Sequence, residues 1–201
     1  MQLRNIILML SLTLSVIACT TPRQQASVAP AADNQEYVLR GFSLSIPASE
    51  GWNVAKQGPL NIVLAKQDKE KDERYAIQAL VVELPNFKSD DEFLEYIESR
   101  MNTKSDKSAS KVIEVKSRLV AGQGEMCVQS HRKEENSTGA GKTENTKQSI
   151  LELVNFTCRY PDKKNAGIYL AYSKRSTTAS TDENLTAQAN KLFSKMNFRD
   201  L

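Results

Sequence analysis

YAIQALVVEL, residues 75–84, is the stretch that decides the fold, because it has the pattern of a strand that is apolar on both sides. Successive side chains of a strand point to opposite faces of a sheet. The apolar residues divide between the two faces: Ile77, Ala79 and Val81 on one, and Leu80, Val82 and Leu84 on the other. Such a strand is covered on both sides. The stretch therefore predicts a sheet that lies between two further layers.

Strand patterns recur before and after this stretch. In YVLRGFSLSIP (37–47), Phe42, Leu44 and Ile46 alternate with small residues, as in a half-buried strand. Pro47 is expected to end this strand, because proline cannot donate to the ladder. Trp52, in the turn that follows, is expected to cover one end of the core. Further strands are predicted at residues 60–65, 111–120, 125–133, 149–160 and 166–174.

Polar segments separate these strands. The charged stretch 67–74 is predicted to be a solvated hairpin loop, and the glycine-bearing stretch 134–147 a longer one. In the strand at 111–120, apolar residues alternate with charged ones and are expected to form its inner side: Ile113, Val115 and Leu119.

Two capping boxes, each followed by an apolar stripe, predict two amphipathic helices. Ser89 and Glu92 open the first helix, whose stripe consists of Phe93, Leu94, Ile97 and Met101. Ser180 and Glu183 open the second, whose stripe consists of Leu185, Ala189, Leu192 and Met196.

The order of these elements is three strands, a helix, four strands and a helix. Strands joined by short connections form a mainly antiparallel sheet, and two amphipathic helices can cover its two apolar faces. The predicted fold is therefore α+β: a three-layer α/β/α sandwich with a mainly antiparallel sheet of about six to seven strands and two main helices.

The amino terminus has the layout of a secretory signal. Arg4 provides a positive start, residues 6–17 form an apolar run, and the small residue Ala18 precedes Cys19. The run is shorter than the roughly 20 residues that cross a bilayer as a helix. Val16-Ile17-Ala18-Cys19 resembles the bacterial lipobox. The resemblance implies cleavage before Cys19, a lipid on its sulfur and an acylated amine. An ordinary signal peptide with an incidental cysteine is the alternative.

This interpretation divides the chain into three parts: a signal peptide (1–18), a lipidated flexible tether (19–35) and a single globular domain (36–201). Residues 20–35 hold no large apolar side chain beyond Val28, so they bury too little surface to offset the entropy lost on ordering. A coil of this length spans about 20–25 Å. Thr20 is not the aspartate that, in lipoproteins, typically causes retention in the inner membrane. We therefore expect an outer-membrane anchor and a domain that faces the periplasm.

Length and charge narrow the class of protein. The roughly 165 residues left after the signal and tether suit one domain with a real core. The chain of 201 residues has a formal net charge of +3, and Arg4 would leave with the signal. Its lysines are interleaved with acids, so nucleic-acid binding has no electrostatic support.

With Cys19 assigned to the lipid, Cys127 and Cys158 remain as an even pair. In an exported, oxidising setting such a pair is expected to form a disulfide. If residues 125–133 and 149–160 pair as a hairpin with these cysteines opposed, the turn falls between Lys142 and Thr143, inside the polar loop. A metal site of Cys127, His131 and Cys158 is the alternative, but it lacks a fourth ligand close in sequence. We expect no metal and no cofactor.

The sequence holds few features that suit catalysis. Gly139–Thr143 (GAGKT) lacks the first glycine of a phosphate-binding loop and precedes a strand instead of a helix. His131 is the only histidine, and its neighbour Ser130 would point to the other face of a strand. Glu83 and Glu152, each inside an apolar strand, are the only candidates for acid–base chemistry. We expect no catalytic residues.

Gly41-Phe-x-Leu-x-Ile-Pro47 followed by Gly51-Trp52, together with the element order, resembles the PsbP-like fold over about residues 36–198. The resemblance implies an α/β/α sandwich and binding to a larger membrane complex, and it transfers no catalytic residue. The expected function is that of a non-catalytic interaction, assembly or maintenance factor of the cell envelope, with an unidentified envelope protein as partner. A small-ligand or lipid-binding module and an envelope hydrolase are the alternatives.

Overall fold

The protein is described from a computed structural model of residues 1–201. The structure describes residues 29–31, 35–46, 51–103, 110–122, 125–138, 147–177 and 184–201. Several features of the sequence lie outside these ranges: the signal segment, Cys19, most of the tether, Pro47, Gly139–Thr143, Ser180 and Glu183.

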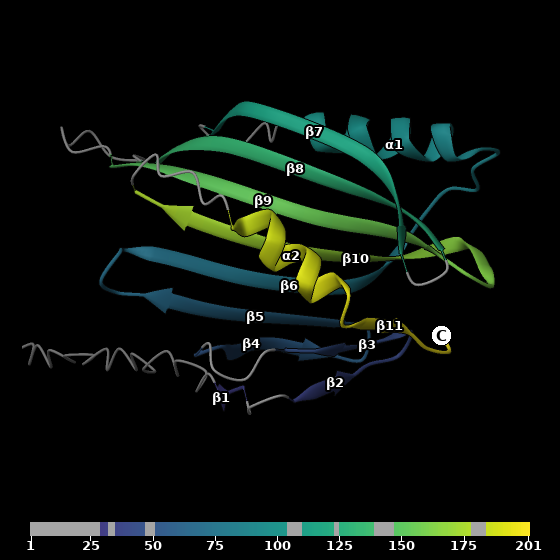
Figure 1. Ribbon diagram of the computed structural model, residues 1–201, viewed down its shortest axis with the longest axis horizontal. Helices are drawn as coiled ribbons and strands as arrows, with labels where there is room; N and C mark the ends of the chain where they lie inside the picture. Colours follow the sequence, from purple (N-terminus) through teal and green to yellow (C-terminus); the bar gives the residue numbers. More distant parts are fainter. Residues whose placement is uncertain are drawn as a thin grey trace, which may run out of the picture.

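The main sheet has eight strands, and every neighbouring pair is antiparallel (Figure 1). In spatial order they are β1 (Ala29–Pro30), β4 (Asn53–Gly58), β5 (Asn61–Asp68), β6 (Glu73–Glu83), β10 (Lys163–Ser176), β9 (Lys147–Tyr160), β8 (Glu125–Thr138) and β7 (Ser110–Gly122). The predicted α+β class and the mainly antiparallel sheet are confirmed. The sheet is larger than the six or seven strands expected.

Two helices pack on the sheet within the described residues. α1 (Asp90–Asn102) contacts β7 and β8, and α2 (Leu185–Phe193) contacts β9 and β10 (Figure 1). Cys127 belongs to the core cluster that contains α2, whereas Val128 belongs to the cluster that contains α1. Adjacent residues of a strand point to opposite faces. We therefore call the two sides of the main sheet the α1 face and the α2 face.

The stretch 75–84 contributes side chains to both faces, as its pattern predicts. Ile77 and Ala79 are buried in the α2-face cluster. Leu84 is buried in the α1-face cluster, and Val82 packs against it.

A second, three-stranded sheet follows the order β11 (Met196–Phe198), β3 (Phe42–Ser45) and β2 (Glu36–Val38). The strand predicted at 42–46 therefore belongs to this second sheet. It is also not half-buried, because Ser43 is as buried as Phe42 and Leu44. Met196 was expected on the second helix, but α2 ends at Phe193, and Met196 pairs with Leu44 instead.

Two predicted loops are shorter than expected because the strands extend into them. Asp68 and Glu73 pair in the β5–β6 ladder, which leaves only residues 69–72 as the turn of the 67–74 stretch. β8 continues to Thr138, so the first part of the stretch 134–147 is strand. β4 was not predicted, because NVAKQG holds one large apolar residue and no clear alternation.

Ile113 is the clearest exception to the predicted inner side of β7. The register of β7 against β8 shifts between Val112 and Glu114, and Ile113 lies at this irregularity with 50% of its surface exposed. A bulge turns one residue out of the alternation, which the sequence pattern does not reveal.

The predicted start of the first helix is confirmed. The Ser89 hydroxyl accepts a hydrogen bond from the Glu92 amide at 3.1 Å, and the Glu92 carboxylate accepts one from the Lys88 amide at 2.6 Å. Phe93 and Ile97 are buried against the sheet. Among the described residues, neither helix has the length and hydropathy needed to cross a bilayer.

The end of the expected tether is ordered where the structure describes it. Ala29 and Pro30 pair with β4, and the Ala31 amide donates to the Trp52 carbonyl at 2.8 Å. Trp52 itself is buried in the α2-face cluster. The paired chain thus includes Ala29, seven residues before the expected boundary at residue 36.

Candidate functional site

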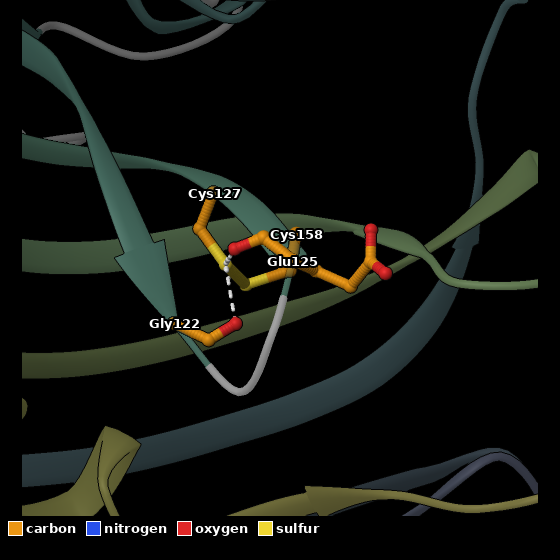
Figure 2. The surroundings of a disulfide bond; sticks show 4 residues. All are labelled: Gly122, Glu125, Cys127 and Cys158. Atoms are coloured by element: carbon orange, nitrogen blue, oxygen red, sulfur yellow. Dashed lines mark hydrogen bonds between the residues drawn. A yellow bond between two sulfur atoms is a disulfide. The ribbon is translucent and has the colours of Figure 1, made fainter.

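Cys127 and Cys158 lie directly opposite each other in β8 and β9, so the predicted register of this hairpin is confirmed. Their sulfurs form a disulfide, shown in Figure 2 beside Gly122 and Glu125, and both residues are fully buried. Sulfurs joined in this way are not metal ligands. Within the described ranges, no three His, Cys, Asp or Glu side chains are grouped as a metal site.

The structure brings two of the candidate residues together. His131 Nε2 lies 2.9 Å from Glu152 Oε1 on the α2 face, and Glu152 is 4% exposed. Glu83 is exposed at the end of β6, opposite Ala166, and takes no part in this pair. Ser130 lies on the opposite face, where its hydroxyl is 2.9 Å from that of Ser117.

A histidine oriented by a carboxylate is two-thirds of a nucleophile–base–carboxylate arrangement. The third part would be a hydroxyl or thiol hydrogen-bonded to the imidazole; among the described residues no such bond is formed, although Thr186 lines the same pocket as His131. In the described part of the chain, the hydrogen-bond partner of His131 is Glu152 alone. Beside His131 is a pocket of about 430 Å³ whose charged walls are Lys116 and Arg118. Arg118 donates to Gln129, and Lys116 pairs with Glu114.

A buried ion pair lies further along the same face. Lys174 Nζ is 2.7 Å from Glu73 Oε1, with side-chain exposures of 6% and 8%. The Tyr75 hydroxyl donates to Glu73 at 2.6 Å. Burial alone would raise the pKa of Glu73, but the hydrogen bonds from Lys174 and Tyr75 outweigh it and hold that pKa below its ordinary value. Sequence alone does not reveal this pair, because Glu73 lies in a charged stretch with the pattern of a solvated loop.

The described residues line a cleft of about 650 Å³. Its lining includes Arg74 and Ala76 of β6 and Ser173 and Arg175 of β10. Ile77 points to the α2 face, so Arg74 and Ala76 point to the α1 face. The cleft therefore opens on the α1 face, away from β7 and β8, which α1 contacts.

Two arginines dominate this cleft. Arg74 and Arg175 are directly opposed partners in the β6–β10 ladder, and both are exposed. Small and apolar residues also line the cleft: Ala65, Ala76, Leu151 and Ser173. The sequence alone gives no sign of this site, because its two arginines are about 100 positions apart and only strand pairing brings them together.

No family model and no curated protein matches the chain. A crystal structure of a protein from Bacteroides thetaiotaomicron is similar to it with a TM-score of 0.43 and 14% identity, over 84% of this chain and 49% of that one. The chain thus spans about half the length of that protein. The Ran-binding protein Mog1p of Saccharomyces cerevisiae is similar with a TM-score of 0.43 and 10% identity, over 85% of this chain and 97% of that one.

Proposed function

We propose that the protein is a lipoprotein of the outer membrane, anchored through Cys19, whose periplasmic domain is a non-catalytic interaction or maintenance factor of the cell envelope. The proposed architecture is the three-layer α/β/α sandwich of the PsbP-like fold. The described helices support it, because they pack on opposite faces of one sheet.

The anchor is supported by Val16-Ile17-Ala18-Cys19 and the apolar run before it. Acyl chains on both the sulfur and the amine of Cys19 anchor a protein stably, since two membrane signals suffice. A disulfide in the mature domain agrees with an oxidising compartment.

One structural observation supports the non-catalytic part of the proposal: the described residues that line the cleft of about 650 Å³ include no His, Asp or Glu that could act as a base for the Ser173 hydroxyl. Elsewhere, Ser130 and His131 point to opposite faces, and Cys127 and Cys158 are joined to each other. These arrangements of side chains suit the binding of a partner or ligand better than catalysis.

Cys19→Ser tests the anchor. We expect this variant to move from the membrane fraction to the soluble fraction, because the thiol that carries the lipid is gone. Thr20→Ala is the matched control and should stay in the outer membrane, whereas Thr20→Asp should shift to the inner membrane. A Cys19→Ser protein that still sediments with membranes would contradict the proposal.

Binding of a small ligand is a second candidate function, and the cleft of about 650 Å³ favours it, since ligand sites commonly occupy roughly 300–1,000 Å³. Pull-down of the mature chain from envelope extracts, with mass spectrometry of the bound proteins and small molecules, separates the two functions. If the protein is instead an envelope hydrolase, its activity will be lost in His131→Ala and Glu152→Ala.

A further inference from the structure

We propose that the cleft between Arg74 and Arg175 binds a phosphate monoester with an apolar body. The phosphate lies between the two guanidinium groups, and the apolar body lies on Ala65, Ala76 and Leu151. This site goes beyond the proposed role in the envelope and does not depend on the lipid on Cys19.

The first argument is the pairing of like charges. Arg74 and Arg175 face each other across neighbouring strands, where side chains start about 5 Å apart and like charges destabilise the sheet. In the described part of the chain, neither guanidinium has a hydrogen bond, an ion pair or an aromatic ring as a partner. No Asp or Glu is among the described residues that line the cleft. An anion from outside the chain would relieve this repulsion.

The second argument is the charge and shape of that anion. A guanidinium binds oxyanions through two parallel N–H donors. The two arginines carry two positive charges. A dianion balances both of them, whereas a carboxylate balances only one. A phosphate monoester is close to a dianion above its second pKa of about 6.

The third argument is the floor of the cleft. Ala65, Ala76 and Ser173 belong to three adjacent strands and are direct neighbours in the ladder. Their short side chains leave room above the sheet, and Leu151 of β9 provides an apolar wall. Free phosphate would leave this surface in water, whereas the apolar part of a monoester would cover it.

Both arginines project from the two strands at the centre of the main sheet, β6 and β10. Their backbones are held in an unbroken ladder from Arg74–Arg175 to Glu83–Ala166. A site built on paired strands needs little ordering when it binds, which favours affinity.

The test is titration calorimetry of the full-length chain with phenyl phosphate, in an uncharged detergent at pH 7.5. It measures the Kd of the protein for phenyl phosphate. We expect Arg74→Gln and Arg175→Gln each to raise the Kd about tenfold or more, the effect of losing a charged hydrogen bond. Ala76→Leu should also raise it, because the larger side chain fills the floor without changing the charge. Arg40→Gln is the matched control: it removes an exposed arginine at the far end of β6, beside Gly41 and Val81, and should leave the Kd unchanged.

Four results would overturn the proposal. The first is no detectable binding of phenyl phosphate at millimolar concentration, and the second is a wild-type Kd in both arginine variants. The third is an Arg40→Gln variant whose Kd rises as much as that of the arginine variants of the cleft. The fourth is inorganic phosphate that binds as tightly as phenyl phosphate. The last result would show that the floor contributes nothing.

A competition assay identifies the source of the monoester. Displacement of phenyl phosphate by phosphatidylcholine vesicles that contain phosphatidate, and not by phosphatidylcholine alone, supports the site with a lipid as its ligand. Binding of phenyl phosphate without displacement by either vesicle supports the site with a soluble monoester. Because every readout is phosphate binding, failure of the lipid anchor on Cys19 would leave these results unchanged.

Discussion

At the scale of single residues, the Glu73–Lys174 pair shows how a charged side chain is kept inside a sheet. Each partner is less than a tenth exposed, so each would be costly to bury alone. The hydrogen bond from Tyr75 occupies the second oxygen of Glu73. Lys66 Nζ lies 4.9 Å from the rings of both Trp52 and Tyr75, which extends this polar cluster along the α2 face.

We predict that Glu73→Gln destabilises the protein by about 3 kcal/mol at pH 7, because it removes the ion pair between Glu73 and the buried Lys174. The pKa of Glu73 in the folded protein lies below its ordinary value of 4.5. The stabilisation is therefore fully present above pH 4.5 and is lost as the pH falls through the folded pKa. Urea unfolding of the wild type and Glu73→Gln should give free energies of unfolding that converge below pH 4.5.

The control is the double variant Glu73→Leu/Lys174→Met, which replaces both charges by apolar groups of similar size. It should be more stable than Glu73→Gln at pH 7, since no charge is left alone. A constant difference between the wild type and Glu73→Gln from pH 7 to pH 3.5 would show that Glu73 is not an ionised partner.

At the scale of secondary-structure elements, the β8–β9 hairpin is closed at both ends. The ladder runs from Ser137–Gln148 and Thr138–Lys147 beside the connecting loop to Cys127–Cys158 at the open end. The disulfide thus fastens the strand ends that lie furthest from the turn. Because both cysteines are fully buried on the α2 face, reductants reach them only when this part of the protein opens.

We predict that Cys127→Ala/Cys158→Ala loses about 3–4 kcal/mol of stability, the chain-entropy value for a closed loop of this size. The sequence separation is 31 residues. The measurement is the midpoint of urea unfolding, with the single variants Cys127→Ala and Cys158→Ala as comparisons. Peptide mapping without reductant should recover the two cysteines in one linked fragment, and free thiols at both positions would refute the bridge.

At the scale of the whole molecule, the two ends of the folded domain meet. β11 near the carboxyl terminus pairs with β3 near the amino terminus. The Gly41 amide donates to the Asp200 carbonyl at 3.0 Å, and the Arg199 amide donates to the Gly41 carbonyl at 3.0 Å. Gly41 has a φ of +94°, and a Cβ there would lie 3.0 Å from Val81. This close approach requires glycine and places the second sheet against the first.

We predict that Met196→Ala destabilises the protein by about 2–4 kcal/mol, because Met196 is fully buried where β11 pairs with β3. Ile113→Ala is the matched control, since Ile113 is half exposed at the irregularity of β7 and surface changes are usually within about 0.5 kcal/mol. Differential scanning calorimetry measures both. Equal shifts in Tm would contradict the different burial of the two side chains.

The local patterns that succeeded are those whose physical cause is local. The alternation at 75–84 predicts a strand with two buried faces, and Ser89 with Glu92 predicts the start of α1. The opposed cysteines agree with the sequence, because a hairpin that pairs them puts its turn inside the polar stretch 134–147, and the register of β8 against β9 has them opposed. Among the candidate site residues, the burial of Glu152 could be expected from its apolar strand, but its contact with His131 could not be assigned from the sequence.

On its own, the sequence therefore indicated most strands of the main sheet, the start of α1, the apolar residues on both sides of β6 and the expected disulfide between Cys127 and Cys158, but not β1, β4 or β11. Tertiary structure alone decided that residues 42–45 and 196–198 form a separate sheet, that Glu73 meets Lys174 and that Arg74 meets Arg175. The reason is physical: periodicity records which side of an element is buried, whereas contacts between distant strands depend on the order of strands in the sheet, which the energetics of the whole fold select.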